Sequence, residues 1–183
     1  MLMLRNVRIS FPHLFKPHAF DNSQDGKYQA TFLIEKASDN EKALKAYIAQ
    51  VAKDKYGDKA QDVIKAQQAT NRALLKDGDD KELDGYAGHW YLKAANKFAP
   101  AVIDRAKEKL EEKDGLPYAG SYVNVQLDIW GQDNKFGKYL NCTLAAVQFW
   151  KDGDSFGGGS RANIDAFDSA DDATPSDDDD EQW

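Results

Sequence analysis

Several features of membrane and secreted proteins are missing from this sequence. Cys142 is its only cysteine, which excludes an internal disulfide framework. No apolar stretch approaches the roughly 20 residues that span a bilayer. Residues 1–5 lack the charged start and long apolar segment of a secretory signal peptide. We therefore expect a soluble protein that works in the cytoplasm, away from membranes.

Signs of catalysis or of a bound cofactor are also scarce. The potential soft metal ligands are scattered without the paired spacing of a zinc site: His13, His18, His89 and Cys142. The sequence has no phosphate-cradling Gly-x-x-x-x-Gly-Lys motif, and the acidic segment 77–82 lacks the glycine required at the sixth position of a calcium loop. We expect no enzyme, no cofactor and no metal. A nuclease that uses the acids of 77–84 with a metal stays open as an alternative.

Positive charge is missing from the C-terminal end. Nine of the 31 acidic residues follow Arg161, and no lysine or arginine does. Residues 1–161 carry 24 basic against 22 acidic side chains, so the body is weakly basic and the end strongly acidic. Residues 156–160 are rich in glycine and have the composition of a flexible linker. Residues 161–183 have too little apolar surface to fold on their own. We predict one domain over 1–154, then a linker and disordered acidic tail over 155–183.

Alternating polar and apolar residues predict about five strands. The clearest alternation covers 5–11, 27–35, 88–94, 121–130 and 138–150. Pro12 is expected to end the first strand and residues 13–20 to form an aromatic and basic loop, while 131–137 form a hairpin tip. Residues 76–85 are expected to form a polar loop. For 101–104 we favour an extended conformation, although residues 106–113 have high helix propensity.

A helical insert separates the second and third predicted strands. Ser38 and Glu41 have the spacing of a capping box. The apolar residues that follow at helical spacing are Leu44, Tyr47, Ile48 and Val51. Gly57 interrupts this helix, and Asp58 is expected to cap a second one. Strands with such an insert fit a mainly β fold built on a small barrel. The five-stranded OB-fold is one such barrel, but strand pattern alone does not separate it from others.

The last two predicted strands carry aromatic rings opposite their apolar faces, with Val147 also on the outer side. The candidate stacking rings are Tyr122, Trp130, Phe136, Tyr139 and Phe149, and the candidate phosphate-binding lysines are Lys16, Lys93, Lys135 and Lys138. Bases stack on aromatic rings at roughly 1–3 kcal/mol each and in a sequence-tolerant way, while lysines neutralise phosphates. The pattern predicts binding of single-stranded nucleic acid. Packing of the rings under a helix or in a subunit contact is an equal alternative.

The C-terminus combines acidic side chains with a final aromatic residue. The residues concerned are Asp177, Asp178, Asp179, Asp180, Glu181 and Trp183. A tryptophan beside a free carboxylate suits capture by a basic, apolar pocket on a partner protein. The acids can also compete with nucleic acid for a basic groove over a Debye length of about 8 Å. A purely solubilising tail is the alternative.

Five stretches in this order resemble the OB-fold single-stranded-DNA-binding proteins of tailed bacteriophages. They are residues 10–15, 27–34, 118–125, 137–144 and 147–149. The resemblance implies a protein that coats single-stranded DNA without sequence preference during phage replication or recombination, in the cytoplasm of an infected bacterium. It also implies that the acidic tail recruits a polymerase or helicase. The alternative is a phage protein–protein interaction module, an assembly or regulatory factor whose aromatic face is a subunit contact. Oligomeric state stays open.

Overall fold

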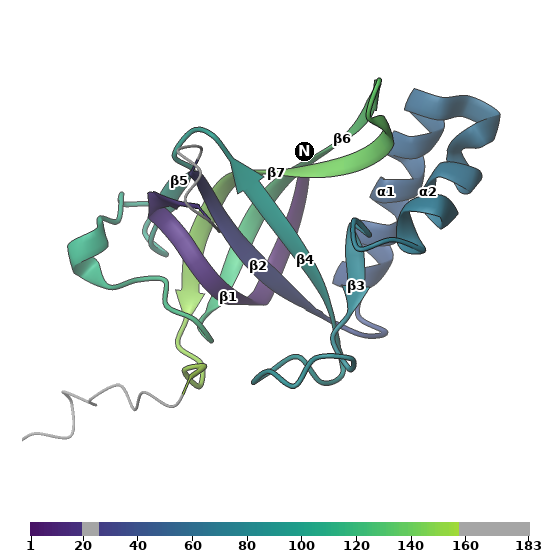
Figure 1. Ribbon diagram of the computed structural model, residues 1–183. Coiled ribbons are helices and arrows are strands. Elements are labelled where there is room, and N and C mark those ends of the chain that lie inside the picture. Colours follow the sequence, from purple (N-terminus) through teal and green to yellow (C-terminus); the bar gives the residue numbers. More distant parts are fainter. Residues whose placement is uncertain (20–25, 158–183) are drawn as a thin grey trace, which may run out of the picture.

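The computed structural model describes residues 1–19 and 26–157, which form a β-barrel with a helical layer at one end (Figure 1). The strands are β1 (Leu2–His18), β2 (Lys27–Glu35), β3 (Leu75–Asp77), β4 (His89–Asn96), β5 (Ala101–Ile103), β6 (Tyr122–Asn134) and β7 (Gly137–Lys151). The helices are α1 (Asp39–Tyr56) and α2 (Ala60–Gln68), with short 3-10 helices at Gly57–Lys59 and Glu112–Asp114.

Five of these strands close the barrel. They pair in the order β1–β2–β4–β7–β6 and back to β1. Each of these pairs is antiparallel except β4–β7, which is parallel through Ala95 and Thr143. The short β3 and β5 add to β4 and β7. A five-stranded, partly open barrel of this kind is the OB-fold, so the predicted barrel with its helical insert is confirmed.

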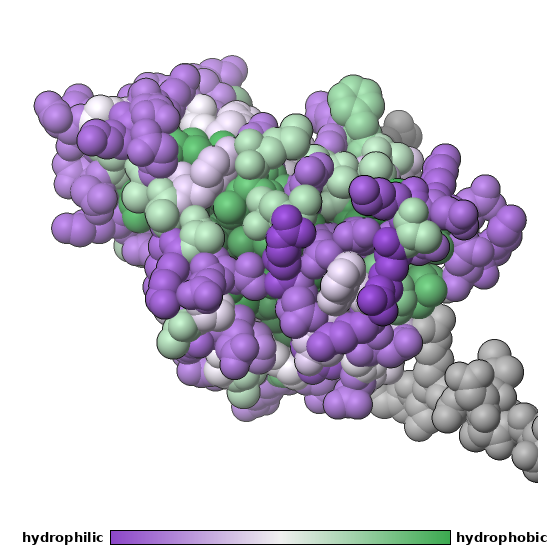
Figure 2. All heavy atoms as spheres, turned by 180° about the vertical axis from the view of Figure 1, so that it is seen from behind, coloured by the Kyte–Doolittle hydropathy of each residue, from purple (hydrophilic) through white to green (hydrophobic). Residues whose placement is uncertain are grey.

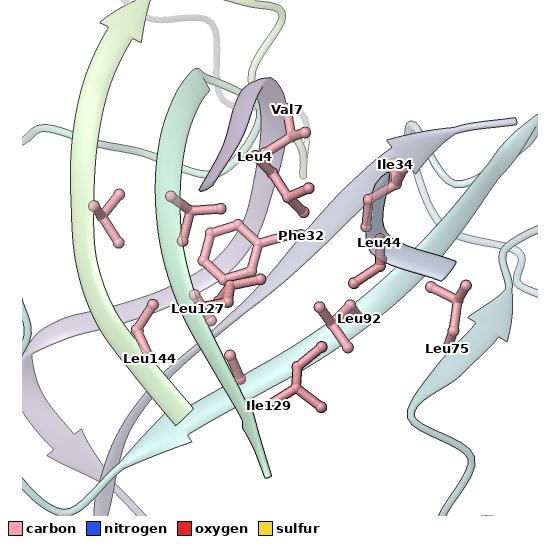
Figure 3. Packing of buried hydrophobic residues seen from close by; sticks show 14 of the residues in the cluster. Leu4, Val7, Phe32, Ile34, Leu44, Leu75, Leu92, Leu127, Ile129 and Leu144 are labelled. Carbon is pink, nitrogen blue, oxygen red and sulfur yellow. The ribbon is translucent and has the colours of Figure 1, made fainter. Parts of the chain in front are cut away.

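The interior is filled by side chains from all sides of the barrel. Figure 3 shows Phe32 of β2 in the centre, beside Leu127 of β6 and near Leu144 of β7. All three are fully buried. Leu44 of α1 is equally buried and lies beside Ile34, so α1 closes one end of the barrel. Each such side chain stabilises the fold by roughly 1.5–3 kcal/mol.

The first strand is longer than predicted. Pro12 does not end β1, which continues to His18 after a shift in its pairing with β2 between Ser10 and His13. This bulge tolerates the proline, because a residue without an N–H fits where the hydrogen-bond ladder is interrupted. It also turns Phe11 outward, with a φ of 49°, and leaves this residue 54% exposed. The predicted loop over 13–20 is therefore mostly strand.

The helices begin and end close to their predicted limits. Ser38 Oγ accepts the backbone N–H of Glu41 at 3.2 Å, and α1 ends at Tyr56, with Gly57 as its C-cap. Asp58 does not cap α2, because residues 57–59 form a 3-10 turn and Lys59 takes the cap position. Figure 2 shows mostly hydrophilic residues on the outer surface of the helical layer, as expected for amphipathic helices. Neither helix is long and apolar enough to cross a membrane, nor is any other helix in the described segments.

Strand β7 changes face halfway along. Its register against β6 shifts by one residue between its first and second halves. Such a bulge reverses the alternation of inward and outward side chains. Val147 is therefore buried opposite Val125, and Phe149 lies opposite Val123. The prediction that Val147 and Phe149 share the outer face with Tyr139 is wrong, because no residue type marks this bulge in the sequence.

The β6–β7 hairpin is also longer than predicted. Pairing continues past Gly131 to its end, so that only Lys135 and Phe136 form the turn. The glycine belongs to the strand, and its small size is needed because α1 approaches closely. A Cβ at Gly131 would lie 2.6 Å from the side chain of Lys55.

Tyr56 at the end of α1 ties this hairpin to the helical layer. Its hydroxyl oxygen lies 2.7 Å from the carbonyl oxygen of Gln132 in β6 and 3.0 Å from that of Tyr139 in β7. Burial and the charge of Asp133 raise the pKa of Tyr56, so the hydroxyl keeps its proton as a donor. Figure 1 shows the hairpin reaching beyond the barrel beside the helices. The helical insert therefore supports the hairpin from one side.

The end of the described chain is fixed to the opposite end of the barrel. The guanidinium of Arg8 lies 4.3 Å from the centre of the Phe156 ring and donates a hydrogen bond to the carbonyl of Asp154 at 2.5 Å. These contacts hold the chain to the barrel as far as the start of the predicted linker. The acidic tail and its terminal Trp183 lie outside the described residues, and their predicted disorder stays a prediction.

Candidate nucleic-acid interface

A groove of about 1020 Å³ runs along one side of the barrel. The second half of β1, strands β2 and β4, and the connection from α2 to β3 contribute residues to it. The β6–β7 hairpin, which the helices support, contributes further residues, and the connection from β3 to β4 adds Lys81, Leu83 and Tyr86. The groove is therefore formed between the barrel surface and a hairpin that is held in place.

The charged side chains that line this groove are positive. Its cationic lining residues are Lys27, Arg72, Lys76, Lys81 and Lys93, and two histidines join them. Among the described residues that line it, none is an aspartate or a glutamate. Clefts with charges of one sign concentrate the field and attract oppositely charged ligands. Although the body is only weakly basic, five of its cationic side chains line a single groove that could hold a polyanion.

Three of the five predicted stacking rings line the groove: Trp130, Phe136 and Tyr139. Trp130 is 43% exposed, and its indole N–H donates to Thr143 Oγ1 at 3.0 Å, which fixes the plane of the ring. Phe136 at the hairpin turn is 67% exposed. Tyr139 lies under the guanidinium of Arg72, whose central carbon is 4.8 Å from the ring centre. Two large exposed rings in an acid-free groove suit stacking of bases.

The structure does not bring the other two predicted rings into the groove. Phe149 is turned toward the core side of β7 by the bulge. Tyr122 lies at the far end of β6, roughly 26 Å from Trp130 at about 3.3 Å per residue. Its ring is half-buried and contacts two cations, with Lys151 Nζ at 4.5 Å and the Arg8 guanidinium at 5.5 Å from its centre. Tyr122 therefore belongs to the end of the barrel where the described chain stops.

Only one of the four predicted phosphate-binding lysines, Lys93 on β4, lines the groove. Partial burial and the charge of Lys76 lower the pKa of Lys93. The other three lysines do not line the groove, and each has a partner. Lys16 is paired with Glu112 at 2.7 Å, and Lys138 with Asp133. Lys135 lies beside the Phe136 ring, 5.1 Å from its centre.

Sequence reasoning missed other groove residues. Phe11 was placed in a strand, and the bulge before Pro12 makes it an exposed ring of the groove. Tyr86, in the segment after the predicted polar loop, is 3% exposed and packs against Tyr91, with ring centres 5.4 Å apart. Burial raises the pKa of Tyr86, whose hydroxyl donates to Ser10 Oγ at 3.3 Å. Tyr91 lies two residues before the predicted Lys93 in β4, and both residues line the groove.

Cys142 also lines the groove, but its thiol is buried. Burial, with a smaller effect of Asp128, raises the pKa of this thiol to about 12. Cysteine reacts as the thiolate, so this group is not a nucleophile at neutral pH. In the segments that the structure describes, no group of three histidine, cysteine or acidic side chains could hold a metal ion.

Comparisons with known proteins show which family and which relatives this chain is similar to. The family model described as "Enterobacter phage Enc34, ssDNA-binding protein" matches residues 1–180. Protein p50 of Acyrthosiphon pisum secondary endosymbiont phage 1 is 44% identical over 172 residues, which cover 91% of this chain and 92% of p50.

Two solved structures of phage single-stranded DNA-binding proteins are also similar to this chain. The single-stranded DNA-binding protein from bacteriophage Enc34, in complex with ssDNA, is 28% identical, with a TM-score of 0.66 over 85% of this chain and 88% of the other. The single-stranded DNA-binding protein gp2.5 of bacteriophage T7 shares the fold at 15% identity, with a TM-score of 0.56 over 95% of this chain and 98% of the other. From the family match and these likenesses, the chain belongs to the family of the Enterobacter phage Enc34 ssDNA-binding protein.

Proposed function

We propose that this protein binds single-stranded DNA, without base-sequence preference, in the groove between the barrel and the β6–β7 hairpin. The observation that carries the proposal is the exposure of Trp130 and Phe136 in a groove whose charged lining residues are all cationic. Rings accept any base, because every base has a π-face. The cations contact phosphates and release counterions. The Enc34 protein solved in complex with ssDNA supports this ligand class.

Titration with oligo-dT, oligo-dA and a duplex of equal length tests this function. Tryptophan fluorescence should be quenched by both single strands and much less by the duplex. The logarithm of the affinity should fall linearly with the logarithm of salt concentration, by about 0.7 per phosphate neutralised. Unquenched fluorescence together with salt-independent behaviour would exclude the groove as a DNA site. Concentration-dependent dimerisation through the same face would instead favour a subunit contact.

We further propose that the protein acts by binding rather than catalysis, during phage DNA replication or recombination in the host cytoplasm. Incubation of a labelled oligonucleotide with magnesium should leave it intact. Cleavage that tracks the purified protein would favour the nuclease alternative.

The acidic tail is proposed to recruit a polymerase or helicase and to compete with DNA for the groove. The support is the contrast in charge between the tail, with nine acids after Arg161, and the acid-free lining of the groove. Removal of residues 162–183 should tighten DNA binding, most at low salt, because a competing anion is lost. Unchanged or weaker binding after truncation would rule out competition. Loss of polymerase or helicase binding in a pull-down would test recruitment separately.

A further inference from the structure

The side-chain amide of Gln67 joins two walls of the groove. Gln67 lies in the last turn of α2, one residue before the helix ends at Gln68, and is 5% exposed. Its Oε1 accepts the backbone N–H of Leu140 at 2.8 Å, and its Nε2 donates to the carbonyl of the same residue at 2.8 Å. The amide thus pairs with β7 much as a neighbouring strand would. Nε2 also donates to the carbonyl of Arg72 at 2.7 Å, in the connection between α2 and β3.

These hydrogen bonds fix the backbone on both sides of a cation–π contact. Arg72 lies over the ring of Tyr139, which directly precedes Leu140 in β7. Both side chains line the groove. Gln67 therefore holds the carbonyl of the arginine itself and the residue next to the tyrosine.

Thr70 completes the support of the arginine. Its hydroxyl donates to the carbonyl of Gln67 at 2.7 Å and accepts the backbone N–H of Arg72 at 3.2 Å. The backbone of Arg72 is thus held at its N–H by Thr70 and at its carbonyl by Gln67. An exposed arginine has many rotamers, and fixing its backbone limits the positions that its guanidinium can reach.

We propose that Gln67 is a positioning residue for single-strand binding, which rests on the function proposed for the groove. Gln67 sets Arg72 and Tyr139 so that one base stacks on the ring while the guanidinium meets the neighbouring phosphate. A buried amide is costly to the fold unless it is fully hydrogen-bonded, and here its bonds go to these two groove segments. The helical insert therefore contributes to DNA binding through an amide that itself needs no contact with DNA.

A double-mutant cycle tests this role. Gln67→Leu should weaken binding of oligo-dT roughly tenfold, a value inside the range for loss of one stacking contact. In a background carrying both Arg72→Ala and Tyr139→Ala, the same change should weaken binding less than twofold, measured at low salt. Coupled residues give such non-additive effects. Gln67→Leu should also reduce the salt slope by about 0.7, as loss of one phosphate contact does. Additive effects, or an unchanged salt slope, would overturn the proposal.

Two further variants keep the test decisive. Gln68→Leu changes the exposed neighbour in α2 and should bind DNA like the parent. If Gln67→Leu fails to fold, Thr70→Val at the exposed Thr70 removes the other hydrogen bond to Arg72. It should weaken binding about threefold, through part of the same effect. Parent-like binding by Thr70→Val would then count against positioning.

The variants also distinguish a failure of the proposed DNA-binding function from a failure of the positioning role of Gln67. If Arg72→Ala and Trp130→Ala both bind like the parent, the groove is not the DNA site and the positioning role falls with it. If these two variants are impaired and Gln67→Leu is not, only the positioning role is wrong.

Discussion

The imidazole rings of His13 and His18 stack in the groove, with their centres 4.1 Å apart and their planes only 7° from parallel. Both lie on the part of β1 that follows Pro12, where the pairing with β2 shifts again. Burial, followed by the charges of His18 and Lys93, lowers the pKa of His13 from its ordinary value of 6.5. At neutral pH His13 is therefore uncharged. Protonation of this ring at lower pH would add one positive charge to the groove.

DNA binding should become tighter as the pH falls, because a bound polyanion favours protonated His13. The pKa of His13 should be higher in the complex than in the free protein. The added affinity is then complete below the pKa of the free protein and is lost as the pH rises through the pKa of the complex. Dissociation constants for oligo-dT between pH 5 and pH 8 measure the effect. The His13→Gln variant should show a weaker pH dependence, and an identical profile would contradict this assignment.

A fall in pH, which should tighten DNA binding through His13, should at the same time lower the folding stability that this residue contributes. The pKa of His13 in the folded protein is lowered, so the unfolded chain binds the proton more readily. The stability that the neutral ring contributes is present above pH 6.5 and is lost as the pH falls toward the folded pKa. Urea unfolding of the parent and of His13→Gln at pH 7.5 and 5.5 checks this. The parent should lose more stability than the variant over that interval.

Trp130→Ala should weaken binding of single strands by about 1–3 kcal/mol, the range for one stacked base. The ring is exposed and is oriented by its hydrogen bond to Thr143, so little reorganisation precedes stacking. Trp150→Ala is the matched control: Trp150 is 36% exposed, lies under the guanidinium of Arg105 and does not line the groove. The conservative Trp130→Phe change should keep most of the affinity and remove most of the fluorescence quenching. Equal losses from the two alanine variants would point to general destabilisation.

Sequence alternation predicts the barrel well where a strand has one buried face without interruption. The limits of β2 are reproduced, and the inward residues of β6 from Val123 to Ile129 are buried as expected. It fails at bulges, since a single extra residue exchanges the two faces. Phe149 was thereby assigned to the wrong side of β7, and Phe11 was not expected to reach the groove.

The site is less predictable than the fold, because it is assembled from segments that are distant in sequence. Gln67 looks like an ordinary polar residue at the end of a helix, and only its pairing with β7 shows its role. Lys16 and Lys138 have the right chemistry but are paired with acids outside the groove lining. Of the four predicted lysines, only Lys93 of β4 lines the groove. Which cations gather in one place depends on tertiary packing, and composition does not reveal it.

Salt dependence should separate the lysines of the groove from those outside it. Lys76 is half-buried in the groove, whereas Lys16 is paired with Glu112 and does not line it. Lys76→Ala should reduce the slope of log affinity against log salt by about 0.7. Lys16→Ala should leave the slope within error of the parent. A similar decrease for both variants would indicate a diffuse electrostatic effect instead of contacts in the groove.

Tyr56→Phe should loosen the β6–β7 hairpin and weaken DNA binding without altering a residue of the groove lining. It removes the hydroxyl that lies between the carbonyl oxygens of Gln132 and Tyr139. Loss of this hydrogen bond should lower the free energy of unfolding by about 1 kcal/mol. Because Phe136 and Tyr139 are carried by this hairpin, affinity for oligo-dT should fall at the same time.

Tyr118→Phe supplies the control for this change. The hydroxyl of Tyr118 is hydrogen-bonded to Asp152 at 2.8 Å and to the Gly153 carbonyl at 3.0 Å, and none of the three residues lines the groove. Its removal should cost a similar amount of stability in urea unfolding and leave DNA affinity unchanged. Since the two variants lose the same chemical group, a fall in affinity for Tyr56→Phe alone would show that the helical layer acts on the groove through the hairpin. Equal affinities would show instead that the hairpin keeps its binding position without this tie.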